Sequence, residues 1–440
     1  MTELFVFDQL TRTRWGEALF ALEGAIHSSH QYASAPDVLS TYRSLYRSLL
    51  DSGHADLASA IADELLYGDS ALARASVRSS TIPAGLYQGA ASDIMMLLYL
   101  LRRDWQEEAS SMGNLIGQEV PPLAHLALAS DQRHQRVSQV FADNLNNPNY
   151  DAERILEQLI THYRKQGYGT LARHDALRWH LPTPQQPHYP HYQTYQQTQQ
   201  QTQQQTLTGI AYPALPDMQQ LIGLERQLTA LCANTEAFLA AKPAQHTLLY
   251  GPRGSGKSTA IKSLLTRYRE AGLRLVEVFP EHLPDLPLIA EQLRPQPARY
   301  VIFVDDLSFD AGDSRYQPLK TLLEGSLSRR PDNVLVYATS NRRHLVTERL
   351  QDRPDPLDDD VHVWDTHNER LALADRFGLT LTFPSAGQRE FLAIVYGLAA
   401  HANLTVDDGF AQRAVQFAKW GNGLSGRVAQ QFIDSERARE

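Results

Sequence analysis

The chain has 440 residues, of which 42% are hydrophobic and 21% charged, and its formal net charge is −9. This length predicts two or three domains, because a single hydrophobic core seldom grows so large. The acidic balance argues against a protein that coats nucleic acid, but not against a local basic stripe. Cys232 is the only cysteine, which excludes intramolecular disulfides and zinc sites built from several thiolates.

The amino terminus lacks a basic segment followed by an apolar one, so we expect no secretion signal. The longest apolar run, residues 94–101, is far shorter than a membrane span and is typical of a buried helix. Together with the lone cysteine, these features predict a cytoplasmic protein that does not contact the membrane.

Residues 1–180 are predicted to form an all-α domain. Apolar residues recur there at helical spacing in stretches that end near a glycine: 38–49, 57–65 and 155–160. We find no convincing strand before Trp179, no fixed-period repeat and no motif that carries chemistry. The histidines of this region also lack the spacing of metal ligands.

Residues 179–216 contain no Asp, Glu, Lys or Arg, and their middle is rich in Gln, Thr, Tyr and Pro. A segment with so little apolar surface cannot fold alone, so we expect residues 181–214 to be a disordered linker. Interleaved Tyr and Gln are also found in segments that self-associate, which is the alternative interpretation.

The rest of the chain alternates short apolar runs with helical stretches. The runs that predict strands are Thr247–Tyr250, 273–278, 300–304, 334–339 and 379–383. Such alternation is typical of a parallel sheet covered by helices on both faces. Beyond Pro384 the pattern is helical throughout. We therefore expect an α/β domain over residues 215–383 and a helical subdomain over 384–440.

The most informative motif directly follows the first of these strands. Residues 251–258 match the phosphate-binding pattern G-x-x-x-x-G-K-[ST] without a mismatch. Glycines let backbone N–H groups surround a polyphosphate, and the helix that begins at Lys257 points its positive end at the same anion. Lys257 would contact the β- and γ-phosphates of ATP, and Ser258 would bind Mg²⁺. The predicted nucleotide-binding residues here are Gly251, Pro252, Arg253, Gly254, Ser255, Gly256, Lys257, Ser258 and Thr259.

Polar residues follow two of the later strands. Asp305 and Asp306 come after the strand at 300–304, where Asp305 would hold the Mg²⁺ together with Ser258. Asp306 is the candidate base for the attacking water. Asn341, which follows the strand at 334–339, is the candidate to orient that water; a turn asparagine at a strand end is the alternative.

The order of these motifs resembles that of the AAA+ ATPases, with residues 251–258 as Walker A, Asp305 and Asp306 as Walker B, and Asn341 as sensor 1. Arg427, at the start of a C-terminal helix, resembles the sensor 2 arginine that contacts the phosphates. Ile222 and Gly223 resemble the segment that flanks the adenine.

Four stretches look more narrowly like a bacterial AAA+ family catalogued only as a domain of unknown function: 304–309, 338–345, 373–378 and 425–432. The resemblance extends from about Gly169 to the C-terminus. It implies an AAA+ P-loop core with a five-stranded parallel sheet and a C-terminal helical lid, here preceded by the all-α domain.

The resemblance also implies ATP hydrolysis, which we expect to be slow. AAA+ proteins usually carry Glu where this chain has Asp306, whose carboxylate is one methylene shorter. Turnover in AAA+ proteins normally needs an arginine from a neighbouring subunit, which implies a head-to-tail oligomer. Arg376 is our candidate, and Arg349 and Arg353 are alternatives because they also fall between sensor 1 and the last strand.

Three roles stay open for such an ATPase: remodelling of an unidentified protein partner recruited by the helical domain, a nucleic-acid-associated loader or repair accessory, and a nucleotide switch with little hydrolysis. Residues 215–440 carry 26 Lys and Arg against 29 Asp and Glu, so their charge does not favour nucleic acid. The loop after the second strand has three prolines and no glycine, unlike the loops of AAA+ proteins that thread polypeptides.

Overall fold

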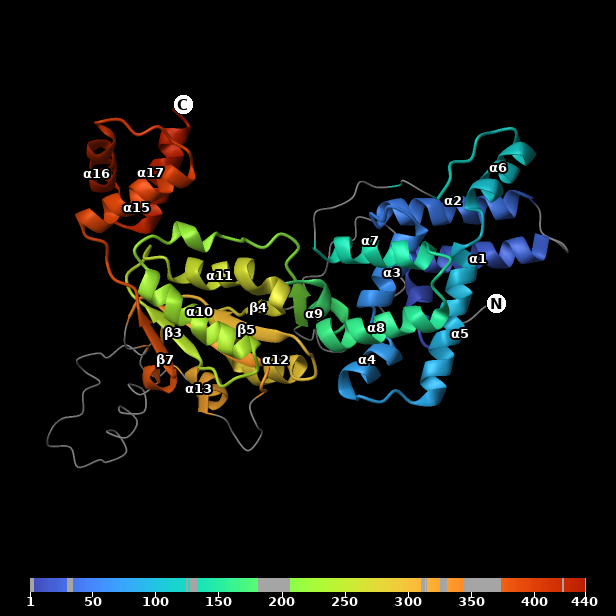
Figure 1. Cartoon of the computed structure of the whole chain (residues 1–440), viewed down its shortest axis with the longest axis horizontal. Coiled ribbons are helices and arrows are strands. Elements are labelled where there is room, and N and C mark those ends of the chain that lie inside the picture. Colours follow the sequence, from blue (N-terminus) through green and yellow to red (C-terminus); the bar gives the residue numbers. More distant parts are fainter. Residues whose placement is uncertain are drawn as a thin grey trace. The chain divides into compact units, whose positions relative to one another are not determined.

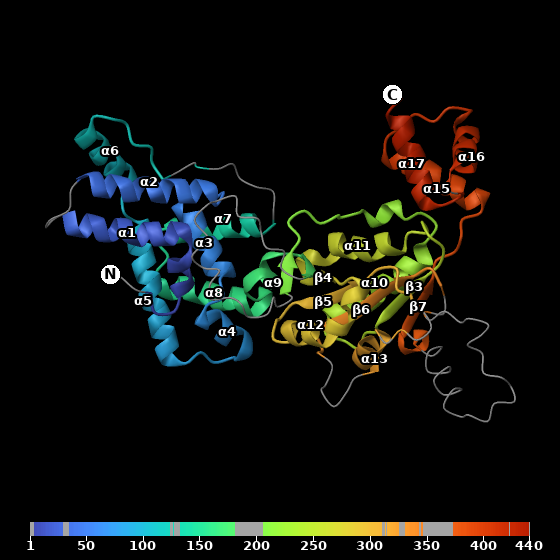
Figure 2. The ribbon, with the colours of Figure 1, turned by 180° about the vertical axis from the view of Figure 1, so that it is seen from behind.

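A computed structural model of the chain describes residues 4–29, 35–123, 126, 133–180, 206–309, 313, 315–324, 331–342, 345, 373–421 and 423–439. The chain divides into two compact units, Met1–Arg173 with Pro295–Pro297, and His174–Arg294 with Ala298–Glu440. Figure 1 shows the elements of both units, and Figure 2 shows them from behind. No helix within the described ranges is both long and apolar enough to cross a membrane.

The first unit is helical throughout its described residues. A 3-10 turn, Asp8–Arg12, precedes α1, and α1 lies beside α2 in both views (Figures 1 and 2). Its helices are α1 (Arg14–Ser29), α2 (Ala35–Asp51), α3 (Leu57–Tyr67), α4 (Ala71–Arg78), α5 (Ala84–Leu101), α6 (Trp105–Ile116), α7 (Arg133–Asn146), α8 (Ala152–Gln166) and α9 (Gly169–Arg173).

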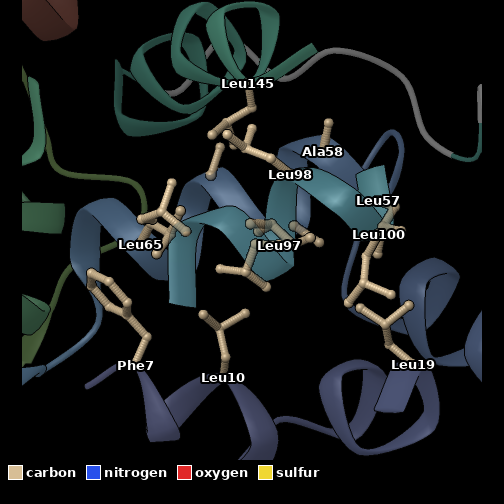
Figure 3. Close-up of a cluster of buried hydrophobic side chains, with 14 of the residues drawn as sticks. Phe7, Leu10, Leu19, Leu57, Ala58, Leu65, Leu97, Leu98, Leu100 and Leu145 are labelled. Atoms are coloured by element: carbon tan, nitrogen blue, oxygen red, sulfur yellow. The ribbon is translucent and has the colours of Figure 1, made fainter. Parts of the chain in front are cut away.

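The core of this unit is made by apolar residues that recur at helical spacing on several helices. In Figure 3, Leu65 of α3, Leu97 of α5 and Leu145 of α7 lie around one interior with Phe7 and Leu10 of the amino-terminal segment. All five side chains are buried. Because these residues come from elements far apart in the sequence, the unit has a hydrophobic core of its own.

A buried carboxylate fixes the amino-terminal segment to this core. Asp93 of α5 is only 2% exposed, and its two oxygens accept hydrogen bonds from the backbone N–H groups of Phe5, Val6 and Phe7 at 2.9, 2.7 and 3.0 Å. Three donors replace the water that the carboxylate loses, which makes the burial tolerable.

The second unit is built on one seven-stranded sheet with the order β2-β1-β4-β5-β6-β3-β7. All neighbouring strands are parallel except the antiparallel pair β1 and β2. The strands are β1 (Ala176–His180), β2 (Thr206–Gly209), β3 (Thr247–Tyr250), β4 (Leu273–Glu277), β5 (Arg299–Val304), β6 (Val334–Ser340) and β7 (Leu379–Thr382).

Helices cover both faces of this sheet. On one face α10 and α11 share a core with Val301 and Phe303 of β5. Ile302 and Val304 alternate with them and are also buried, on the face where α12 and α13 lie (Figures 1 and 2). These helices are α10 (Glu225–Leu239), α11 (Lys257–Tyr268), α12 (Leu286–Leu293) and α13 (Tyr316–Glu324).

Three helices form the C-terminal part of this unit: α15 (Gln388–His401), α16 (Phe410–Trp420) and α17 (Gly426–Arg437). They pack around Phe391, Phe410 and Phe432, and the rings of the last two lie 5.2 Å apart. Together with the parallel sheet, they confirm the predicted fold class of an α/β P-loop core followed by a helical lid.

The predicted number of strands was wrong. The five expected strands are present as β3 to β7, but β1 and β2 extend the sheet. β1 contradicts our expectation that no strand precedes Trp179, and β2 lies in the predicted linker, of which residues 181–205 fall outside the described residues. β1 is too short to be recognised locally. Pairing with β4 and an ion pair between Asp175 and the fully buried Arg274, 3.2 Å long, hold it in the sheet.

Candidate nucleotide-binding site

The loop between β3 and α11 has a backbone that only glycine allows at key positions. Gly254 and Gly256 adopt φ angles of +75° and +94°, in the left-handed region. At Gly251 a Cβ atom would collide with the carbonyl oxygen of Phe383, and at Gly256 it would lie 2.9 Å from Leu221. Phe383 and Leu221 therefore leave no room for a side chain at these two positions of the loop.

Lys257 is the first residue of α11, and it is 7% exposed because its side chain folds back onto the loop. Its Nζ donates hydrogen bonds to the carbonyl oxygens of Gly251 and Pro252, at 2.7 and 2.8 Å, and to Oδ1 of Asn341 at 3.2 Å. Burial holds the pKa of Lys257 below its usual value, although the nearby charges of Asp305 and Asp306 oppose this shift. The lysine thus joins the first turn of α11 to the end of β6.

Two hydroxyl groups converge on the Asp305 carboxylate. Ser258 Oγ and Thr339 Oγ1 each donate a hydrogen bond to Oδ1 of Asp305, at 2.6 and 2.5 Å. The register of β5 and β6, in which Val304 pairs with Ala338, brings Thr339 next to Asp305. The predicted metal-binding pair therefore lies together, with Ser258 in the first turn of α11 and Asp305 directly after β5.

Asp306 turns away from the strand that precedes it. It has a φ of +52°, which is uncommon outside glycine, and its backbone N–H donates to Thr339 Oγ1 at 2.9 Å. Its carboxylate accepts a hydrogen bond of 2.5 Å from Nδ2 of Asn341, and Arg253 Nη2 lies 3.9 Å from its other oxygen. The candidate base and the candidate sensor are thus in direct contact.

The lid contacts both the phosphate loop and the segment that precedes α10. A Cβ atom on Gly254 would lie 3.0 Å from Ser425 Oγ and 3.5 Å from Cβ of Arg427, so the start of α17 lies against the loop. Ile222 packs against the hydrophobic core of the lid, and the Gly223 N–H donates to Glu225 at 3.0 Å. The predicted adenine-flanking segment therefore touches the lid.

The structure places the remaining predicted residues as follows. Pro252 and Arg253 are exposed on the loop, and Thr259 follows Ser258 in the first turn of α11. Arg376 lies in a 3-10 turn, Ala374–Arg376, where it is ion-paired with Glu324 at the end of α13. Its side chain is 17% exposed. The alternative arginines, Arg349 and Arg353, lie outside the described residues.

Sequence reasoning missed Thr339. It is 1% exposed, and its one hydroxyl accepts from the Asp306 backbone and donates to the Asp305 carboxylate. The strand ends in two polar residues, Thr339 and Ser340, and nothing in the sequence indicates which of them contacts the carboxylates. Only the pairing of β5 with β6 gives that threonine a partner.

The residues of the loop fit a magnesium nucleotide. Beside the glycine conformations, Ser255 Oγ is buried with no hydrogen-bond partner among the described residues, as a donor aimed at a bound anion would be. A hydroxyl and a carboxylate oxygen, from Ser258 and Asp305, are the hard ligands that Mg²⁺ prefers, and it commonly shares such sites with phosphate oxygens.

A protein-family model described as "Protein of unknown function (DUF815)" matches residues 191–440. Among solved structures, the RuvB Holliday junction branch migration motor of Thermotoga maritima is 16% identical over 48% of this chain and 59% of that chain, with a TM-score of 0.33. A point mutant of the same motor gives 18% identity, 48% and 62% coverage and a TM-score of 0.34. The chain spans less than two thirds of these motors, and TM-scores this low carry no functional conclusion.

We expect Thr339→Val to weaken Mg²⁺-dependent ATP binding by about tenfold, because a group that orients a metal ligand typically has an effect of this size. Titration of Mg²⁺ into the full chain with ATP, followed by calorimetry, measures the change. Thr321→Val is the matched control, since Thr321 lies exposed on α13 and donates only within its own helix. An unchanged Mg²⁺ requirement in Thr339→Val would show that the Asp305 carboxylate needs no such support.

Proposed function

Because the chain belongs to the DUF815 family, whose description assigns no activity, its function has to be inferred from its own site, and we propose that it binds ATP with Mg²⁺ and hydrolyses it slowly. One observation carries the proposal. Ser258, at the start of α11, and Thr339, on β6, donate to the same oxygen of Asp305, which brings the phosphate loop and the carboxylates together.

Each residue has a distinct part in this proposal. The loop N–H groups and Lys257 would bind the phosphates, while Ser258 and Asp305 would hold the metal. When bound, Mg²⁺ supplies positive charge that stabilises the phosphates as the γ-phosphate bond breaks. Asp306 would accept the proton of the attacking water, oriented by Asn341 at 2.5 Å from Asp306.

The geometry of Asp306 supports slow turnover. Its carboxylate is already engaged by Asn341 and lies near Arg253, so these contacts must loosen before it can act as a base. The same observation favours the second candidate function, a nucleotide switch that barely hydrolyses. Measured turnover in the oligomer separates the two.

We further propose that the helical first unit recruits a protein partner in the cytoplasm. It has its own core, and on α5 the side chains of Met95 and Tyr99 are 58% and 56% exposed beside a cavity of about 610 Å³. The cavity is also lined by charged residues of both signs, Arg102, Arg103, Asp151 and Glu153, and apolar side chains beside such a mixed rim favour a protein partner over nucleic acid. Hydrolysis that DNA stimulates, or DNA binding that salt abolishes, would instead support a nucleic-acid-associated ATPase.

Asp306→Asn should retain ATP binding and lose turnover by about a hundredfold, because the amide keeps the shape of the side chain but is not a base. Phosphate release and calorimetry measure the two properties separately. Lys257→Ala is the comparison variant and should lose binding as well. Phosphate release that stays unchanged in Asp306→Asn rules out this residue as the base.

Arg376→Ala should abolish hydrolysis and leave nucleotide affinity nearly unchanged, if Arg376 acts on the site of a neighbouring subunit. Mixing Arg376→Ala with Asp306→Asn should then restore part of the activity, since mixed interfaces contain one intact site. Glu324→Ala separates this role from a structural one, because it breaks the same ion pair and leaves the arginine in place. Equal loss of activity in Glu324→Ala and Arg376→Ala, with no recovery on mixing, would assign Arg376 to the fold alone.

A further inference from the structure

Four side chains form a continuous polar series across the phosphate loop. Lys257 Nζ donates to Asn341 Oδ1 at 3.2 Å, and Asn341 Nδ2 donates to Asp306 Oδ1 at 2.5 Å. Arg253 Nη2 completes the series 3.9 Å from Asp306 Oδ2. One oxygen of the Asp306 carboxylate therefore faces a neutral amide, and the other faces a cation.

Arg253 is the weakly held member of this series. Its side chain is 82% exposed, and 3.9 Å exceeds the length of a hydrogen bond. Exposed ion pairs of this kind contribute little free energy, so the guanidinium is free to exchange its partner. A phosphate group that carries two charges competes well for an arginine, because the planar guanidinium can donate two parallel hydrogen bonds to it.

Because Arg253 lies on the loop itself, its guanidinium would need to move only a short way from Asp306 to a bound phosphate. Arg253 stands between Gly251 and Gly254, in the backbone segment that would surround the phosphates, and it already lies next to the candidate base. Two of its loop neighbours are engaged elsewhere, since the Gly251 and Pro252 carbonyl oxygens accept from Lys257. Among the described contacts, the Arg253 guanidinium pairs only with Asp306.

We propose that Arg253 is a γ-phosphate sensor that acts within its own chain. It pairs with Asp306 when no triphosphate is bound and with the γ-phosphate when ATP is bound. This inference rests on the proposed function and deepens it by naming the residue that distinguishes ATP from ADP. The pairing with Arg253 also explains how the Asp306 carboxylate, which is one methylene shorter than that of the usual Glu, is kept from acting as a base until ATP is bound.

The move of Arg253 from Asp306 to the γ-phosphate couples ATP binding to ATP hydrolysis. When the guanidinium leaves Asp306, Oδ2 becomes available to accept a proton from the attacking water. The water oxygen bonds to the γ-phosphorus, the bond from that phosphorus to the β-phosphate oxygen breaks, and the proton ends on the Asp306 carboxylate. The products are ADP and phosphate, and Arg253 returns to Asp306 once the carboxyl group has released its proton to solvent.

The first test is binding, measured by calorimetry with Mg²⁺ and the full chain. Arg253→Ala should weaken the affinity for adenosine 5′-(β,γ-imido)triphosphate about tenfold and leave the affinity for ADP within about twofold, as expected when one charge-assisted contact to the γ-phosphate is lost. Arg267→Ala is the matched control, because Arg267 is also exposed and lies 3.8 Å from its partner, Glu236. It should change neither affinity.

The outcomes distinguish failure of the proposed nucleotide binding from failure of the role assigned to Arg253. If the unaltered chain binds neither nucleotide, the proposed function itself fails. If it binds both and Arg253→Ala weakens them equally, or weakens neither, only the assignment of Arg253 is overturned. A selective loss of triphosphate affinity supports the sensor.

The second test establishes that Arg253 acts on its own subunit. Mixtures of Arg253→Ala with Asp306→Asn should turn over no faster than the two variants measured separately, because each subunit then lacks one component of its own site. Turnover in the mixture above the sum of the two variants would place the Arg253 contact across a subunit interface and overturn the proposal.

Discussion

One oxygen of a carboxylate holds the two halves of the candidate site together. Asp305 Oδ1 accepts from Ser258 Oγ at 2.6 Å and from Thr339 Oγ1 at 2.5 Å, and these donors come from α11 and β6. Asp305 itself follows β5, which lies next to β6 in the sheet. The phosphate loop can therefore not move relative to the strand ends without breaking a charge-assisted hydrogen bond.

Further contacts connect the Asp305 region to the sheet and the phosphate loop to the lid. Toward the sheet, Thr339 also binds the backbone of Asp306 and so sets the direction of the candidate base. Toward the lid, Gly254 lies against Ser425 at the start of α17, and Ile222 packs into the lid core. The phosphate loop and the segment before α10 are thus both in contact with lid helices that lie outside the sheet, so a change at the phosphates would have a physical route to the lid.

Much of the fold could be predicted because its signals are local. The glycines of residues 251–258 and the helix that begins at Lys257 follow from backbone chemistry, and buried strands give continuous apolar runs. Thr339 and the pairing of Arg253 with Asp306 could not be found in this way. The first depends on strand register and the second on a positive φ at Asp306, and neither is visible in a window of sequence. The strand β1 was missed because its stability comes from β4, nearly a hundred residues away along the chain.

We infer that Ser258 and Asp305 hold a metal ion beside a bound triphosphate. Calorimetric titration of the unaltered chain with ATP, in Mg²⁺ and then in excess chelator, tests it most directly. We predict that binding is tight in Mg²⁺ and at least about tenfold weaker without it, because both the phosphates and the Asp305 carboxylate then lose their shared cation. Absence of binding in Mg²⁺, or equal affinity in the chelator, would contradict the account.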